Sequence, residues 1–313
     1  MSPEVTAAAI AAGVSVLTLI GTLAAQYFGR LATRRDTRQA LEEQREQLAR
    51  TLAEQRTRAL NERFATAAGQ LGSDKPPVQL AGVYAMAGLA DDWEKNRQTC
   101  VDVLCAYLRM PYEPDPGPDA PEPQRLAFQA TRVVRHTVIA VITEHLREDA
   151  AVSWQGLTFH LTGAVFDGAD FRWACFSGGT VNFNNAEFCG PGWTFFSGAQ
   201  FSGAGTLFSG AQFSGGTVDF SGAQFSGGRV EFSGANFCGA EVYFRGAQFT
   251  GTEVDFVGVE HLGGAGYFGD TQFSGGTVDF SDVSDWSFPP TFPWTDAAPP
   301  TVKLPEEVDP SQG

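Results

Sequence analysis

Large apolar residues recur at fixed, short spacings through the second half of the chain. Across residues 161–176 they stand five positions apart, and each follows a second apolar residue by two positions. After residue 176 the spacing changes to steps of seven and five, which alternate without error from Phe208 to Phe256 and give a unit of twelve, as in FSGAQFSGGTVD at residues 208–219. Repeats this short and regular predict a solenoid, in which each coil covers the apolar side of its neighbour.

The residue types of each unit suit an extended segment followed by a corner. In extended backbone, residues i and i+2 point to the same side, so Ala and Phe, or Val and Phe, point inward together. A Ser-Gly pair then turns the chain, because Gly accepts backbone angles that other residues avoid. We therefore expect a core of stacked Phe columns in coils about 4.8 Å apart. Its predicted members are Phe166, Phe171, Phe176, Phe213, Phe220, Phe225, Phe232, Phe237, Phe244, Phe249 and Phe256.

These units resemble the pentapeptide-repeat family, whose A(D/N)Lxx repeats wind a right-handed, four-sided β-helix. The resembling residues are AVFDG at 164–168, ADFRW at 169–173, and the Ala-x-Phe units through Phe273. The resemblance covers residues 152–288 and implies a right-handed quadrilateral β-helix. Two departures stand out: Phe replaces Leu, and every second unit from Val181 has two extra residues. A coil of 24 residues on four faces and a flatter coil of twelve both remain open.

The two possible coil lengths stack different outward-pointing residues on one another. In a coil of 24, Glu231, Asp255 and Asp279 stack on one face and Tyr243 stacks with Tyr267 on another, whereas in a coil of twelve acids and Tyr mostly alternate. Repulsion between stacked like charges costs only roughly a few tenths of a kcal/mol, which is too little to decide between the two coil lengths. The four-sided coil is favoured by the resemblance alone. The short steps carry amides that would form ladders, namely Gln200, Gln212, Gln224, Asn236, Gln248 and Gln272.

One position departs from the repeat. His261 occupies a Phe position, five after Phe256 and seven before Phe268. A buried imidazole could mark a site. Alternatively, the chain slips by one residue and Leu262 fills the position, because a lone buried imidazole is costly.

The first thirty residues predict a membrane anchor. Residues 5–25 carry no charge, and about 20 apolar residues in a helix span the ~30 Å hydrocarbon layer of a bilayer. The chain starts with Met-Ser-Pro-Glu, whereas a cleavable signal peptide has a basic start. Arginines follow the span at residues 30–38 and none precedes it. The N-terminus is therefore expected outside a single-pass cell membrane and the rest of the chain in the cytoplasm.

The region between the anchor and the repeats has helical composition. Residues 31–63 contain no Gly or Pro, which favours a solvated helix. Leu41, Leu48 and Leu52 fit a heptad that also buries polar residues, so a homo-oligomeric coiled coil is the alternative. Within residues 64–112, the two helical patterns at residues 78–108 loosely resemble a HEAT-like helical hairpin. Cys100 and Cys105, five apart, fit small buried residues better than a metal or redox pair.

The resulting order of segments resembles membrane-anchored actinobacterial members of the same family. Trp286, Phe288, Phe292 and Trp294 would cover the last coil, and the tail after Ala297 is expected to be disordered. The fold class is thus α plus β-solenoid. Its predicted segments are a transmembrane anchor (1–30), a charged juxtamembrane helix (31–63), a helical hairpin region (64–112), a Pro-rich linker (113–124), a helix capping the solenoid (125–150), the repeat β-solenoid (151–288) and a Pro-rich tail (289–313).

Composition narrows the classes of function. With 36 Asp and Glu against 21 Lys and Arg, the net charge is -15, which argues against binding nucleic acid through its phosphates. Five Cys without framework spacing suit a reducing compartment. The four His have no zinc spacing, and no motif for catalysis or a cofactor is found. We therefore predict no catalytic, cofactor-binding or metal-binding residues.

The prediction for function is a non-catalytic scaffold that presents a rigid solenoid to an unknown protein partner. The lipid bilayer would be contacted through residues 5–25. One alternative comes from the resemblance, because some pentapeptide-repeat proteins mimic B-DNA and shield type II topoisomerases. Residues 151–288 hold 13 acids and three Arg, which is a thin charge for that role. The other alternative is an enzyme with its site in the helical region.

Overall fold

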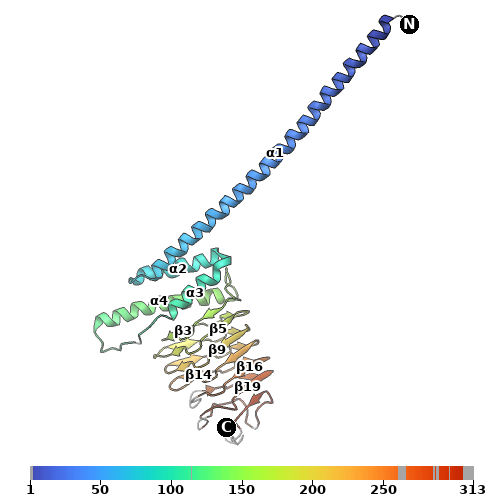
Figure 1. Ribbon diagram of the computed structural model, residues 1–313. Coiled ribbons are helices and arrows are strands. Elements are labelled where there is room, and N and C mark those ends of the chain that lie inside the picture. The colour runs from blue at the N-terminus through green and yellow to red at the C-terminus, as the bar shows by residue number, and fades with distance from the viewer. Residues whose placement is uncertain are drawn as a thin grey trace. The chain divides into compact units, whose positions relative to one another are not determined.

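The computed structural model describes residues 3–113, 115–259, 266–284, 286, 289–295 and 297–305. The chain divides into two compact units, Met1–Glu62 and Arg63–Gly313. Its architecture is a helical region followed by a parallel β-solenoid (Figure 1).

Helix α1 runs from Pro3 to Leu71 without interruption. No Pro occurs between residues 4 and 75, and Gly72 directly follows the last turn, so no stop signal ends the helix earlier. Among the residues whose side chains the structure describes, no helical stretch is both long and apolar enough to span a bilayer. The side chains of residues 5–12 and 14–16 in the expected anchor lie outside that description. The anchor therefore stays a prediction.

Four further helical elements precede the strands. They are α2 (Pro76–Asp92), the short 3-10 helix η1 (Glu94–Asn96), α3 (Arg97–Leu108) and α4 (Glu122–Leu146). Helix α2 starts at a Pro pair, where the missing N–H groups cost nothing. Helices α2, α3 and α4 pack on one another around Val83, Leu104 and Val138, which are fully buried. Helix α3 contacts β1 and α4 contacts β3, so this group covers one end of the solenoid (Figure 1).

The strands form four parallel sheets, which we number as faces 1 to 4 in the order in which the chain visits them. Face 1 consists of β1 (Phe159–His160), β5 (Thr180–Asn182), β9 (Gly205–Leu207), β13 (Arg229–Glu231), β16 (Thr252–Asp255), β19 (Gly276–Asp279) and β20 (Val302–Lys303). Face 2 consists of β2 (Val165–Phe166), β6 (Glu187–Phe188) and β10 (Gln212–Phe213). Face 3 consists of β3 (Ala169–Asp170), β7 (Trp193–Phe195), β11 (Thr217–Asp219), β14 (Glu241–Tyr243) and β17 (Gly266–Tyr267). Face 4 consists of β4 (Cys175–Phe176), β8 (Gln200–Phe201), β12 (Gln224–Phe225), β15 (Gln248–Phe249) and β18 (Gln272–Phe273).

Strand registers decide the length of the coil. On face 3, Thr217 pairs with Glu241, and on face 4, Gln224 pairs with Gln248, a separation of 24 in each case. Two long and two short steps therefore make one coil with four faces, and the two-sided coil of twelve is wrong. The amides consequently separate into one ladder on face 4 and a pair on face 2. The right-handed sense implied by the resemblance stays a prediction.

The interior of the solenoid is filled by stacked rings. All eleven Phe of the predicted core are buried, with exposed fractions of 0–6%. Ring centroids of stacked Phe in successive coils lie 4.5–5.5 Å apart, close to the spacing of the strands themselves. The column behind face 3 contains Phe171, Phe196, Phe220, Phe244 and Phe268, and the other three faces have equivalent columns.

The far end of the solenoid is closed by its own chain. Phe292 stacks on Phe268, with ring centroids 5.5 Å apart, and Trp294 packs edge-on against Phe273 at the same distance. The expectation of a disordered segment after Ala297 is wrong for residues 298–305. There β20 adds a strand to β19, because Val302 buries its side chain and Lys303 pairs with an acid of face 1. Phe288, like His261 and Leu262, lies outside the described residues.

Candidate functional site

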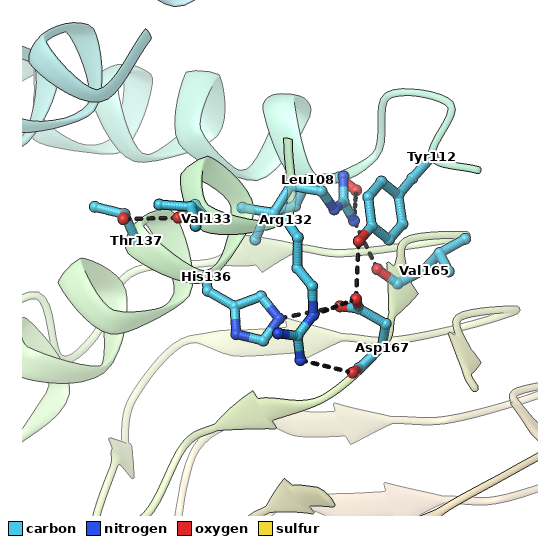
Figure 2. Close-up of polar contacts among 9 residues, drawn as sticks. Leu108, Tyr112, Arg132, Val133, His136, Thr137, Val165 and Asp167 are labelled. Carbon is cyan, nitrogen blue, oxygen red and sulfur yellow. Dashed lines mark hydrogen bonds and ion pairs between the residues drawn. The ribbon is translucent and has the colours of Figure 1, made fainter. Parts of the chain in front are cut away.

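The most concentrated polar cluster of the described residues surrounds Asp167, at the corner after β2. Its carboxylate accepts hydrogen bonds from the Tyr112 hydroxyl at 2.8 Å and from Arg132 Nε at 2.7 Å, and it lies 3.0 Å from His136 Nε2. Figure 2 shows that these side chains converge from α4 and from the segment after α3. An Asp, a His, a Tyr and an Arg in contact could belong to a catalytic site. The protonation states of these groups bear on whether they could act as catalytic acids or bases.

The protonation of Asp167 and Tyr112 does not suit acid–base catalysis by these two groups. Burial raises the pKa of Asp167, but hydrogen bonds from His136, Tyr112 and Arg132 outweigh that effect and lower the pKa to about 2. Burial and the hydrogen bond to Asp167 raise the pKa of Tyr112 far above its usual range. At neutral pH the Asp167 carboxylate and the Tyr112 phenol therefore keep their protonation states, whereas a catalytic acid or base works best with a pKa near the working pH.

The neighbouring contacts show that this cluster holds the helices on the first coil. Arg135 is 3% exposed, and its Nη2 donates to the carbonyl of Leu108 at 2.9 Å and of Val165 at 2.6 Å. Gln98 of α3 pairs with the backbone of Thr158 through both its amide nitrogen and its amide oxygen, at 2.7 and 2.9 Å. Polar side chains thus satisfy backbone groups at this open end of the solenoid, which would otherwise invite pairing with another chain.

The cysteines of α3 are buried thiols. Cys100 and Cys105 have no exposed surface. Burial raises the pKa of Cys100 to about 11 and, together with nearby Asp102, that of Cys105 to about 12. Because the thiolate is the nucleophile and the metal ligand, neither residue is suited to either role at neutral pH.

One open cleft of about 490 Å³ lies beside α4, and another of about 440 Å³ lies between the segment after α4 and face 4. Asp170 lines the first cleft, and hydrogen bonds from Arg172 lower its pKa, so it stays ionised. Within the described ranges, no group of three His, Cys, Asp or Glu side chains could hold a metal ion. The cleft linings are His136, Ile139, Ala140, Thr143, Glu144, Arg147 and Asp170 for the first, and Arg147, Glu148, Asp149, Trp173, Cys175, Gly198 and Gln200 for the second.

The four faces of the solenoid differ in chemistry. Face 4 presents a ladder of Gln side chains, because Gln200, Gln224, Gln248 and Gln272 stand in register. Face 1 presents the row Glu231, Asp255 and Asp279. These acids are paired: Arg229 contacts Glu231 and Asp255 at 3.1 and 3.0 Å, and Lys303 contacts Asp279 at 2.8 Å.

Face 3 presents aromatic side chains to solvent, and we call its outward residues the aromatic face. Trp193 is 50% exposed and stacks on half-buried Phe195, with centroids 5.4 Å apart. Tyr267 is 40% exposed and stacks on Tyr243 at 4.9 Å. The members of the aromatic face are Asp170, Trp193, Phe195, Asp219, Glu241, Tyr243 and Tyr267.

Part of this surface is predicted by the sequence. The pairing of Tyr243 with Tyr267 and the row of acids on face 1 follow from a coil of 24, and both are present. Trp193 and Phe195 were not anticipated, although Phe195 occupies an outward position directly before the inward Phe196. The Asp167 cluster carried no sequence signal, since its partners lie 31 to 55 residues away. His261 lies outside the described residues.

The fold and this surface define a class of protein, namely a filled β-solenoid repeat protein with distinct outer faces. Two family models match the repeat region: pentapeptide repeats over residues 208–260 and again over residues 159–180. The repeat region is therefore of the pentapeptide-repeat family, with Phe in the core positions. No curated protein and no solved structure matched the chain in the other two comparisons.

Proposed function

We propose that this protein is a non-catalytic scaffold whose solenoid binds a protein partner through the aromatic face. The observation that carries the proposal is the exposed row of rings, in which Trp193 and Tyr267 expose 50% and 40% of their surface. Tyr and Trp are enriched among residues that dominate binding energy at protein interfaces. The row lies on paired strands over a packed core, so binding costs little conformational entropy.

The proposal is tested by partner capture with matched surface variants. The full chain, extracted in detergent, carries Trp193→Ser and Tyr267→Ser together, and the control carries Gln200→Ser and Gln272→Ser on face 4. We expect a partner that copurifies with the native and the control chain and is lost from the aromatic variant. A failure to recover any partner that depends on residues 151–288 would contradict the proposal.

A tether to the cell membrane is the second part of the proposal. The uncharged run at residues 5–25 supports it, and the arginines at residues 30–38 favour a cytoplasmic solenoid. The likeness to anchored actinobacterial members rests on the same order of segments. Two reporters fused after Gly313 test the orientation. A reporter that is active only in the cytoplasm should show activity, whereas activity of a reporter that functions only outside the cell would overturn the predicted orientation.

Pairing of two chains through α1 is a further part of the proposal. Leu41, Leu48 and Leu52 expose 47%, 58% and 56% of their surface, and an isolated helix with such a seam gains from a second copy. Sedimentation of the detergent-extracted chain, native against Leu48→Glu with Leu52→Glu, tests it. A dimer that becomes a monomer in the variant is the expected result, and a native monomer would remove the coiled coil.

DNA mimicry is less well supported than protein binding. A mimic of B-DNA needs regularly spaced unpaired acids, whereas Arg229 and Lys303 pair with all three acids of the face 1 row. Unchanged fluoroquinolone sensitivity on overexpression is the result we expect.

A further inference from the structure

The aromatic face already holds one of the chain's own arginines between a carboxylate and a ring. Arg172 donates from Nε to Asp170 Oδ1 at 2.9 Å and from Nη2 to Oδ2 at 2.6 Å. Its Cζ lies 4.9 Å from the centroid of the Phe195 ring. Asp170 and Phe195 are register partners on adjacent coils. One coil therefore supplies the carboxylate, and the next coil supplies the ring that the guanidinium covers.

The same pair of groups recurs two coils further along the face. Asp219 and Tyr243 are register partners on adjacent coils, again with the carboxylate on the earlier coil and the ring on the later one. The backbone geometry repeats as well, because the N–H two residues later bonds to the carboxylate in both places: Arg172 N to Asp170 at 3.1 Å and Ser221 N to Asp219 at 2.9 Å. The residue in the position of Arg172 is Ser221, which is too short to cover the Tyr243 ring.

The surroundings of Asp219 and Tyr243 extend this second pair. Tyr267 stacks on Tyr243, so two rings lie side by side beyond the carboxylate. Glu241 is exposed and accepts a hydrogen bond from the Tyr243 hydroxyl at 2.9 Å. Asp219 accepts from the neutral hydroxyl of Ser197, and in the described part of the chain neither acid forms an ion pair. These two carboxylates thus keep their charge available for a cation from outside.

From this repetition we infer that the surface formed by Asp219, Glu241, Tyr243 and Tyr267 binds an arginine side chain of a partner protein. The incoming guanidinium takes the place that Arg172 has two coils earlier, with paired hydrogen bonds to Asp219 and its plane over the Tyr243 ring. This inference rests on the proposed function and adds to it the chemistry of the partner segment.

Arginine fits this surface better than lysine does. The planar guanidinium donates two parallel hydrogen bonds to one carboxylate and also stacks on a ring, whereas an ammonium does neither. Cation–π contacts add further attraction where a cation covers Tyr. A phosphate-bearing or acidic partner would instead be repelled by Asp219 and Glu241.

A peptide titration tests the inference directly. The probe is a fluorescein-labelled peptide of eight residues in which Gly and Arg alternate, added to the full chain in detergent at 0.15 M salt. Its counterparts carry citrulline or Lys in place of Arg. We expect the citrulline peptide to bind about tenfold or more weakly, because it keeps the shape and loses the charge, and the Lys peptide to bind more weakly than the Arg peptide.

Matched variants locate the binding. Ser221→Arg supplies the arginine within the chain and should weaken peptide binding about tenfold, whereas Ser233→Arg adds the same charge two residues after Glu231 on face 1 and should not. Asp219→Asn should weaken binding more than Glu231→Gln, which removes one charge from face 1. Conversely, Arg172→Ser should expose the Asp170–Phe195 pair and add a second binding site. Circular dichroism verifies that every variant is folded.

Three results would overturn the inference: no binding of the Arg peptide, equal binding of the citrulline peptide, or equal effects of Ser221→Arg and Ser233→Arg. Its failure is separable from failure of the proposed function. A captured partner that is lost with Trp193→Ser and Tyr267→Ser but is insensitive to Ser221→Arg and Asp219→Asn would leave protein binding intact and remove only arginine recognition.

Discussion

At the scale of single residues, position within the coil decides what a side chain contributes. Phe220 and Phe195 show the contrast, because both lie in strands or corners of face 3 yet point to opposite sides. Phe220 has no exposed surface and stacks between Phe196 and Phe244 at 4.7 and 4.9 Å. Phe195 is half-buried and points outward, where it meets Trp193 and Arg172.

Truncating these two Phe should have very different costs. We expect Phe220→Ala to lower the free energy of unfolding by about 3–5 kcal/mol, because it leaves a cavity among packed rings. Phe195→Ala should lower it by less than about 1 kcal/mol, as is usual for a surface position. Urea unfolding measures both. Equal costs would mean that the interior is not packed as described.

Two glycines at corners separate backbone strain from close packing. Gly216 and Gly222 both have positive φ, +68° and +66°. A Cβ on Gly222 would meet nothing within 4 Å, whereas a Cβ on Gly216 would overlap the carbonyl oxygen of Gly192 in the preceding coil. We expect Gly222→Ala to cost about 1–2 kcal/mol, from strain alone. Gly216→Ala should cost roughly 1–3 kcal/mol more, because the backbone must move. Urea unfolding of the two variants measures both costs. Equal losses of unfolding free energy would show that the coils are not in contact at Gly216.

Asp167 makes the junction with the helices sensitive to acid. Its pKa is about 2 in the folded chain against an ordinary value of 3.8. Because folding lowers this pKa, the ionised carboxylate stabilises the fold at pH values above the ordinary pKa. This contribution disappears as the pH falls from about 4 to about 2. We expect roughly 2 kcal/mol of stability at neutral pH from this group.

The comparison with Asp167→Asn isolates that contribution. The variant should unfold at lower urea concentration than the native chain at pH 6, and the difference should shrink steadily towards pH 2. A difference independent of pH would show that the Asp167 carboxylate is not what stabilises the junction.

At the scale of elements, the sequence predicts the strand and its inward side but not the angle between strands. The Val-x-Phe steps of faces 1 and 3 are chemically alike, as are the Ala-x-Phe steps of faces 2 and 4, so the pattern repeats every twelve residues while the coil needs 24. Only pairing between coils reveals the four-sided shape. The Asp167 cluster was unpredictable for a related reason, because tertiary packing brings its residues together from α4, the segment after α3 and a corner.

Removing whole coils tests the 24-residue repeat. Deletion of residues 217–240 joins Gly216 to Glu241, the register partner of Thr217, so every later strand should keep its face and the chain should still unfold cooperatively. Deletion of residues 217–234 instead puts an Ala-x-Phe step where a Val-x-Phe step belongs. We expect this second variant to lose cooperative unfolding by circular dichroism, and equal stability of the two would contradict a four-sided coil.

At the scale of the whole molecule, the distribution of chemistry points to the outside of the solenoid. The rings fill the interior, the helices and Trp294 cover the ends of the stack, and the polar cluster at Asp167 is committed to holding α4 in place. What differs from one face to another is the outward side chains, with amides on face 4, paired acids on face 1, and rings beside the carboxylates of Asp219 and Glu241 on face 3. The proposed binding of a partner is therefore placed on these outer surfaces.

The most direct measurement places a photo-crosslinking residue on each face of a single coil in the full chain within cells. The four positions are Asn236 on face 2, Tyr243 on face 3, Gln248 on face 4 and Glu253 on face 1. Irradiation should yield a discrete protein adduct from position 243 and little or none from the other three. Adducts from no position, or equally from all four, would contradict a scaffold that binds its partner through the aromatic face.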